Sequence, residues 1–151
     1  MAEPDVLRAP HVLEYAYTRS VGPVIGAFLT ALRDGRILGA RGSDGAVIVP
    51  PTEYDPLTAA ATGELVEVGP GGVVTTWAWA SHPLADQPLD HPFAWALITL
   101  DGATTGLLHV VDAGSPEAVS SGMRVTARWR PEAERRGHLL DIESFVAEGA
   151  S

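Results

Sequence analysis

The side chains of this sequence best suited to chemistry are its five histidines, two of which flank a proline-rich stretch. His82 and His91 enclose Asp86 and Asp90. Two imidazoles and a carboxylate are able to bind a metal or to transfer protons, so a metal-dependent enzyme is one hypothesis. The alternative is that these residues form the solvated rim of a loop. No two histidines have the four-residue spacing of the helical pair in metalloproteases.

Other reactive side chains fit structural roles better than catalytic ones. His109 stands inside the apolar run LLHVV, where a histidine is usually a core or interface residue with satisfied hydrogen bonds. Neither Ser43 nor Ser81 occupies the G-x-S-x-G pattern of a serine nucleophile. The glycine-rich stretch 69–72 lacks the lysine and the following helix of a phosphate-binding loop. We expect a hairpin turn there.

Three tryptophans indicate either a core or an aromatic surface. Trp77 and Trp79 are two residues apart in a strand-like run, so they share one face of a strand, and Trp95 lies on the expected neighbouring strand. In proteins that bind single-stranded nucleic acids, such side chains stack on bases. The net charge of −9 opposes that function. Two interpretations remain, namely core packing and a surface for a hydrophobic ligand or partner.

Residues 41–58 have the outline of a small motif with two turns. A first turn is followed by a hydrophobic step, the double proline Pro50–Pro51 and a second turn. Loops of this outline commonly hold a metal through cysteines, but the chain contains no cysteine. A thiolate metal site, a cysteine nucleophile and a disulfide are therefore excluded. We refer to residues 41–45 as the first knuckle and to residues 52–58 as the second knuckle.

The elements that must position these residues are one helix and a series of short strands. Residues 23–34 place Val24, Phe28 and Leu32 on one face at helical spacing and end at a glycine stop. Brief strands are expected on both sides of the first knuckle. Beyond residue 62 the chain is strand-like, with turn signals at roughly 8–12-residue spacing. Five main strands favour a small barrel, most commonly the OB-fold. The six strand-like stretches that contain these five main strands are 63–69, 73–82, 93–100, 105–112, 124–131 and 139–148.

Composition and charge narrow the classes of function. The 151 residues are 46% hydrophobic and 19% charged, which is typical of a folded protein. With only ten arginines and lysines, the chain lacks the clustered positive charge that phosphate contacts need. Residues 1–10 lack the apolar core of a signal peptide, and no apolar run approaches the roughly 20 residues that span a bilayer. We expect a cytoplasmic protein without nucleic-acid or membrane partners.

In the order and spacing of its segments, the stretch 23–146 resembles a known family, the zinc-ribbon plus OB-fold proteins associated with acyl-CoA and thiolases. The resemblance implies that residues 61–68 and 71–83 form the first hairpin of the barrel. It also divides the chain into an N-terminal arm, helix and degenerate ribbon (1–60) and an OB-fold barrel (61–151). The segments that show it are FLTALRDGRI, VPP, ATGELVEV, GGVVTTWAWASHP, FAWALITLDGATTGLLHVVD and SGMRVTARW.

The same resemblance places Arg41, Asp44, Asp55 and Thr58 where the family has its four zinc cysteines. Arginine cannot bind zinc, and two carboxylates with a threonine form a poor structural zinc site. Zinc contributes about 10 kcal/mol or more to the folding of such a module, whereas an exposed pair of Arg41 with Asp44 or Asp55 contributes about 0.2–1 kcal/mol. We therefore expect no zinc and interpret the knuckles as a docking surface.

The resemblance implies a non-catalytic partner subunit of a thiolase-like enzyme of the lipid-transfer type. The complex would act on acyl-CoA thioesters, in a retro-aldol cleavage during steroid side-chain degradation. The chain itself would need no cofactor. The alternative is a free-standing module that binds acyl-CoA or a lipid at the barrel mouth. Phe28 and Tyr54 are the expected apolar anchors. The complete set of expected partner- or ligand-contacting residues is Phe28, Arg41, Tyr54, Trp77, Trp79, His82 and Trp95.

Overall fold

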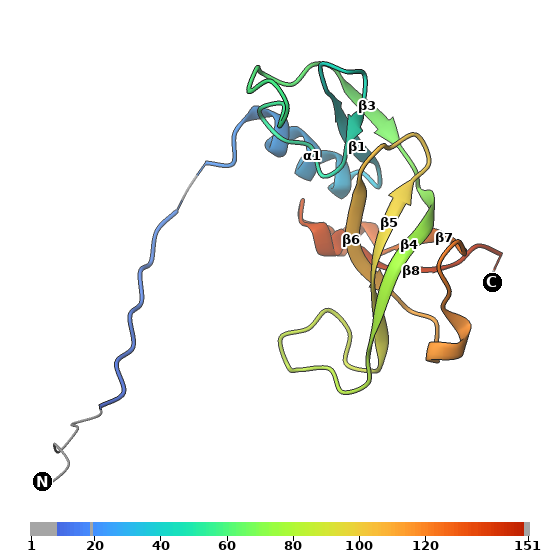
Figure 1. The fold of residues 1–151 in the computed structure, drawn as a ribbon. Helices are drawn as coiled ribbons and strands as arrows, with labels where there is room; N and C mark the ends of the chain where they lie inside the picture. Colours follow the sequence, from blue (N-terminus) through green and yellow to red (C-terminus); the bar gives the residue numbers. More distant parts are fainter. Residues whose placement is uncertain (1–8, 19, 150–151) are drawn as a thin grey trace, which may run out of the picture.

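The computed structural model describes residues 9–18 and 20–149 of the chain (Figure 1). Within these residues the chain forms one α-helix and eight strands, which lie in two sheets. Three short 3₁₀ turns connect them. The elements are α1 (Pro23–Arg33), β1 (Ile37–Arg41), β2 (Val47–Ile48), β3 (Leu65–Val68), β4 (Gly71–Ala80), β5 (Phe93–Leu100), β6 (Gly106–Val111), η1 (Pro116–Ala118), β7 (Arg124–Trp129), η2 (Glu132–Glu134), η3 (Leu139–Asp141) and β8 (Ile142–Ala147).

Five strands close into a barrel in the order β4-β5-β6-β8-β7. Neighbouring strands are antiparallel except β6 and β8, which are parallel. The longest pairing joins β4 to β5, from Gly72 opposite Leu100 to Ala80 opposite Phe93. A closed, five-stranded barrel of this kind is an OB-fold. The prediction of a mainly β protein with this barrel behind one helix is confirmed.

The other three strands form a small antiparallel sheet in the order β2-β1-β3, which we call the ribbon sheet. β3 pairs with β1 from Ile37 opposite Val68 to Ala40 opposite Leu65. The expected barrel hairpin between residues 61–68 and 71–83 is therefore wrong. Because Ile37 and Val68 are both buried, pairing β3 with β1 removes their apolar surface from water.

The glycine-rich stretch 69–72 is accordingly a link between the two sheets and not a hairpin turn. Gly69 has φ +66° and donates its N–H to the carbonyl of Asp101 at 2.9 Å. Gly72 packs so closely on β5 that an added Cβ would lie 2.7 Å from the carbonyl oxygen of Thr99. The glycines therefore turn the chain from the ribbon sheet into the barrel at close quarters.

The barrel interior is a packed core that continues into the ribbon sheet. Ile98, Leu107 and Phe145 are almost completely buried in the barrel. Leu32 of α1 belongs to the same cluster of apolar side chains. Figure 1 shows α1 beside the ribbon sheet at one end of the barrel. The helix, the ribbon sheet and the barrel therefore share one hydrophobic core.

The helix α1 begins after Gly22 with Pro23 at its first position, as the sequence predicts. Gly22 has no side chain to cap the helix, and Glu53 of the second knuckle takes this role. Its Oε1 accepts the N–H of Val24 at 2.9 Å and that of Ile25 at 3.1 Å. A carboxylate is favourable at a helix N-terminus, so this contact fixes the second knuckle against α1.

In the described part of the chain no helix is both long enough and apolar enough to cross a bilayer.

Candidate functional site

The two knuckles are held together by one buried carboxylate. Asp55 is only 3% exposed. Its Oδ2 accepts the N–H of Ser43 in the first knuckle, and its Oδ1 accepts the N–H groups of Leu57 (2.7 Å) and Thr58 (3.3 Å) in the second. The hydrogen bond from Ser43 is the main cause that lowers the pKa of Asp55 to about 2. Asp55 is therefore ionised at neutral pH and ties one turn to the other.

This arrangement does not fit a zinc ion. Both carboxylate oxygens of Asp55 already accept backbone N–H groups. Asp44 accepts the N–H of Ala46 at 2.9 Å within its own turn. Arg41 pairs with neither aspartate, contrary to expectation. Its Nε lies 3.9 Å from Glu64. The donor set lacks the thiolates and imidazoles that a structural zinc site needs.

The second knuckle turns apolar side chains towards solvent around the buried carboxylate. Tyr54 is 66% exposed and Leu57 is 72% exposed, whereas Asp55 between them is buried. The turn is closed by hydrogen bonds from the N–H of Asp55 to the carbonyl of Ala60 and from the N–H of Ala59 to the carbonyl of Asp55, and by a bridge from Tyr54 to Ala61. The sequence-based choice of Tyr54 thus falls on an exposed side chain, and Leu57 is a neighbour that the sequence reasoning missed.

Phe28, the other expected anchor, is placed differently. It is 4% exposed and lies in the core between α1, the ribbon sheet and the barrel. The expectation that it forms part of a partner surface is wrong for this structure. The physical reason is that helical spacing identifies the apolar face of α1, and this face is turned towards the chain's own core.

The tryptophans lie on opposite faces of the barrel sheet. Trp77 and Trp79 stand opposite the buried Ala96 and Ala94 and pack against the main core. Of the two interpretations, core packing therefore applies to Trp77 and Trp79. Trp95 has the opposite orientation, because successive side chains of a strand alternate between the faces.

Trp95 belongs to a smaller apolar cluster on the outer face of the barrel. Its ring meets Phe93 edge to face, with centroids 5.4 Å apart. Leu89, from the loop between β4 and β5, and Val110 complete the cluster. Farther along the same face, Leu97 pairs with Leu108, which is 54% exposed. The outer face is thus partly covered by the loop and partly open.

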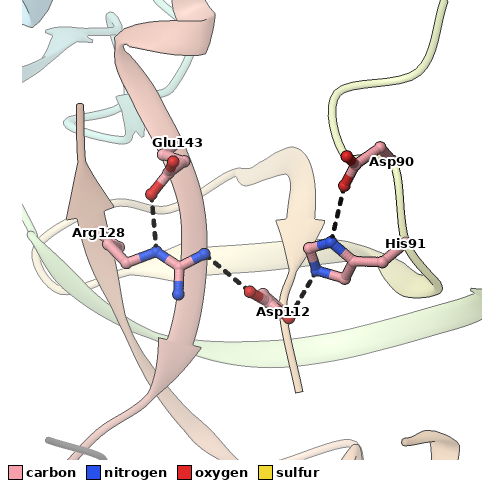
Figure 2. Close-up of polar contacts among 5 residues, drawn as sticks. All are labelled: Asp90, His91, Asp112, Arg128 and Glu143. Atoms are coloured by element: carbon pink, nitrogen blue, oxygen red, sulfur yellow. Dashed lines mark hydrogen bonds and ion pairs between the residues drawn. The ribbon is translucent and has the colours of Figure 1, made fainter. Parts of the chain in front are cut away.

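His91 belongs to a chain of charged side chains that fastens this loop to the barrel (Figure 2). Its Nδ1 lies 3.1 Å from Asp90, and its Nε2 lies 3.2 Å from Asp112, just beyond β6. The other oxygen of Asp112 accepts from Arg128 at 2.7 Å, and Arg128 Nε donates to Glu143 at 2.9 Å. The loop 81–92 is thereby linked to β6, β7 and β8.

The charged side chains around His91 favour its protonated form. Hydrogen bonds to Asp90 and then to Asp112 raise the pKa of His91. Partial burial acts to raise the pKa of Asp112, but the hydrogen bonds from Arg128 and His91 outweigh it and lower that pKa. Both ring nitrogens of His91 are engaged, so neither is free to ligate a metal or transfer a proton to a substrate. The geometry indicates a fastening and not a catalytic centre.

The remaining histidines do not complete a catalytic site. His82 is exposed, and His91 contacts Asp90 and Asp112 and not His82. Across residues 9–18 and 20–149, no three histidine or acidic side chains are grouped so as to hold a metal. His109 is a core residue, since its Nδ1 accepts the N–H of Val110 at 2.9 Å and burial lowers its pKa. The described residues therefore provide no site for the metal-dependent enzyme that the sequence suggested as one hypothesis.

A cleft that the sequence did not indicate lies beside η2 and η3. Asp141 on its wall accepts three backbone N–H groups, from Arg136, Gly137 and His138. Among the described residues, Arg130 and Arg136 lie within 4 Å of no carboxylate. The cleft is therefore suited to an anionic group. Its volume is about 470 Å³, and it is lined by Arg130, Glu134, Arg136, His138, Leu140 and Asp141.

The sequence reasoning also missed the function of Asp55 and the partners of His91. Asp55 stood out only as a poor substitute for a cysteine. A usable signal was the run Asp55-Pro56-Leu57-Thr58, because aspartate side chains accept backbone N–H groups two or three residues further on in turns. No local signal exists for Asp112, which lies 21 residues beyond His91.

The fold and this site together define an OB-fold protein with a ribbon that is closed by a carboxylate. Residues 65–130, from β3 to the end of β7, match the sequence model of the family described as "ChsH2, C-terminal OB-fold domain". This match confirms the resemblance to the zinc-ribbon and OB-fold proteins. No curated protein matches the chain in sequence.

Two solved structures are similar in fold. One is a protein of unknown function from the DUF35 family of Sulfolobus solfataricus, with a TM-score of 0.58 and 23% identity over 71% of this chain and 77% of that chain. The other is described as an Ltp2-ChsH2(DUF35) aldolase, with a TM-score of 0.63 and 19% identity over 86% of this chain and 98% of that chain. At these identities the likeness shows the fold alone.

Proposed function

We propose that this chain is a non-catalytic partner subunit that docks on a thiolase-like enzyme through its second knuckle. The observation that supports this most directly is the orientation of three neighbouring residues. Tyr54 and Leu57 are exposed, while the carboxylate of Asp55 is buried and bound to both knuckles. A turn fixed from within that exposes two large apolar side chains has the character of an interface anchor.

The comparisons support the choice of a thiolase-like partner. One structural relative is described as an aldolase of Ltp2 and ChsH2(DUF35), and the match of residues 65–130 is to the OB-fold domain of ChsH2. By analogy the partner of this chain is a thiolase-like enzyme of the lipid-transfer type. This enzyme would act on acyl-CoA thioesters. More specifically, it would cleave a steroid side chain in a retro-aldol reaction.

A test of this function is the dependence of activity on both chains. The thiolase-like protein from the same source is expressed with and without this chain and is assayed for cleavage of a β-hydroxyacyl-CoA thioester. Cleavage is expected only when both chains are present. Full activity of the thiolase-like protein alone would contradict a partner function.

The contribution of the second knuckle is tested separately. The double variant Tyr54→Ser with Leu57→Ser is expected to weaken association by roughly tenfold or more, because anchor side chains dominate interface energies. Leu84→Ser is the matched control, since Leu84 is equally exposed but lies in the loop between β4 and β5. Equal weakening by the control would show that the knuckle has no special function.

The arginine cleft favours a second candidate function, a module that itself binds acyl-CoA. Arg130 and Arg136 face a cleft of about 470 Å³ with a histidine beside them, and guanidinium groups are well suited to phosphates. The packed barrel interior does not favour the barrel mouth as the site. Titration of the isolated chain with CoA tests this candidate, and binding that is unaffected by Arg130→Gln and Arg136→Gln would contradict it.

A further inference from the structure

Residues 9–18, which precede α1, form an extended arm that makes no packing contact with the other described residues. Val12, Leu13, Tyr15 and Tyr17 are 68–77% exposed, although all are large hydrophobic residues. Figure 1 shows residues 9–18 leading away from α1 without lying against the helix or either sheet. Large apolar side chains grouped in this way usually mark an interaction site.

The backbone of the arm is also unpaired. Among the described residues, no hydrogen bond involves the N–H or C=O groups of residues 9–18 or 20–21. The sequence alternates in the manner of a strand, with Leu13, Tyr15 and Tyr17 on one side and Glu14 and Ala16 on the other. An extended segment with a free backbone and alternate apolar side chains is suited to adding a strand to another protein's sheet.

We propose that residues 11–17 bind the thiolase-like partner as an added β-strand, with Leu13, Tyr15 and Tyr17 in an apolar groove beside the edge of its sheet. This inference rests on the proposed partner function and gives it a second contact. Two tyrosines bury about 300–500 Å², which is roughly half of the about 800 Å² that each side of a standard interface buries, so the arm adds to the contact of the second knuckle and does not replace it.

Other occupants fit the arm less well. A membrane surface is disfavoured because residues 11–18 contain no lysine or arginine and the chain carries a net charge of −9, whereas anionic lipids attract basic segments. A second copy of this chain offers few free strand edges among its described residues. The barrel is closed, and the N–H groups of Val47 in β2 and of Val49 just beyond it donate to threonine side chains of the loop 101–105.

The test compares two double variants of the full chain for binding to the co-expressed thiolase-like protein. Tyr15→Ser with Tyr17→Ser removes the apolar side and is expected to weaken binding by roughly tenfold or more. Glu14→Ser with Ala16→Ser alters the opposite side in the same segment and is expected to change binding by less than about threefold. Because the arm packs on nothing in its own chain, both variants should keep the Tm of the native protein.

A second measurement examines the backbone. Amides of residues 11–17 should exchange at unprotected rates in the isolated chain and become slower by roughly a hundredfold in the complex, as strand amides do. Loss of binding in the tyrosine variant together with this protection would support the inference. Protection that is absent in the complex would overturn the added strand.

The outcomes separate the arm from the partner function. If the native chain binds the thiolase-like protein and the tyrosine variant binds equally well, the arm inference fails and the partner function stands. If the native chain does not bind, both fail. Tyrosine-dependent dimerisation without the partner, or tyrosine-dependent binding to phosphatidylserine vesicles, would overturn the inference in favour of a second copy or a membrane.

Discussion

The carboxylate of Asp55 accepts the backbone N–H of Ser43 and so joins the second knuckle to the first. The same carboxylate accepts the N–H of Leu57 at 2.7 Å within its own turn. The resemblance described above places one of the family's four zinc cysteines at this position. Here one buried anion organises both turns through hydrogen bonds, and Tyr54 and Leu57 remain available to a partner.

Replacing Asp55 by asparagine should loosen the ribbon. The neutral amide keeps the shape of the side chain but loses the charge-assisted bonds, which are the stronger kind. We expect the amides of Ser43 and Leu57 to exchange faster by roughly tenfold or more, measured by NMR hydrogen exchange. Asp44→Asn is the control, because Asp44 accepts one N–H at an exposed turn. Equal effects of the two variants would contradict a special function of Asp55.

The same carboxylate predicts a loss of stability in acid. Its pKa falls from an ordinary value of 3.8 to about 2 on folding. A lowered carboxyl pKa contributes stability that is present above the unfolded pKa and is lost as the pH falls through the folded pKa. Urea unfolding between pH 5 and 2 should therefore show a decline from about pH 4 downwards that is smaller in Asp55→Asn. An identical decline in the variant would contradict this assignment.

His91 should make the loop 81–92 respond to pH in the opposite direction. Bonds to Asp90 and Asp112 raise its pKa, so its contribution is present below the ordinary value of 6.5 and is lost as the pH rises through the raised pKa. The protonated ring faces Asp90 and Asp112, and Arg128 and Glu143 lie beyond Asp112. NMR titration of His91 tests the direction directly.

Substitution of His91 tests whether the pH dependence of the loop 81–92 arises from the contacts of this residue. In His91→Gln the protection factors of the loop amides should be lower than in the native chain at pH 6 and should no longer differ between pH 6 and pH 8. His82→Gln serves as the control because His82 is exposed in the same loop. A pH dependence that persists in His91→Gln would place its origin elsewhere.

Because the barrel interior is packed, substitutions on its inner and outer faces should differ sharply in their effect on the free energy of unfolding. Phe145 is fully buried and its ring lies 5.5 Å from that of His109. Phe145→Ala should lower the free energy of unfolding by about 3–5 kcal/mol, a large part of a typical total of about 5–15 kcal/mol. Leu108→Ala on the outer face should change it by less than about 0.5 kcal/mol. Urea denaturation of both variants measures the contrast, and similar losses would contradict the assigned faces.

Local patterns in the sequence were sufficient for the elements but not for their pairing. Pro23 and the glycine after Asp34 mark the ends of α1, and alternation marks β4 and β5, because these signals lie within a few residues of the structure they specify. The partner of β3 depends on β1, more than 20 residues earlier along the chain. No local signal specifies such a pairing.

The candidate site was predictable only in part for the same reason. Tyr54 was identified from the outline of the knuckles and is exposed. The face on which Trp77 and Trp79 lie depends on a register that shifts at a bulge between Val74 and Thr76 of β4, and a one-residue shift moves a side chain to the opposite face. The function of Asp55 depends on Ser43 in another turn, which only the folded chain brings near.

The measurement that tests the central claim most directly is the mass of the complex in solution. This chain is co-expressed with the thiolase-like protein from the same source, with a tag on this chain alone, and the purified material is analysed by light scattering during size-exclusion chromatography. The account predicts a stable complex with a fixed ratio of the two chains, which the knuckle variant Tyr54→Ser with Leu57→Ser weakens. Elution of this chain as a well-behaved monomer, separate from an active thiolase-like protein, would contradict it.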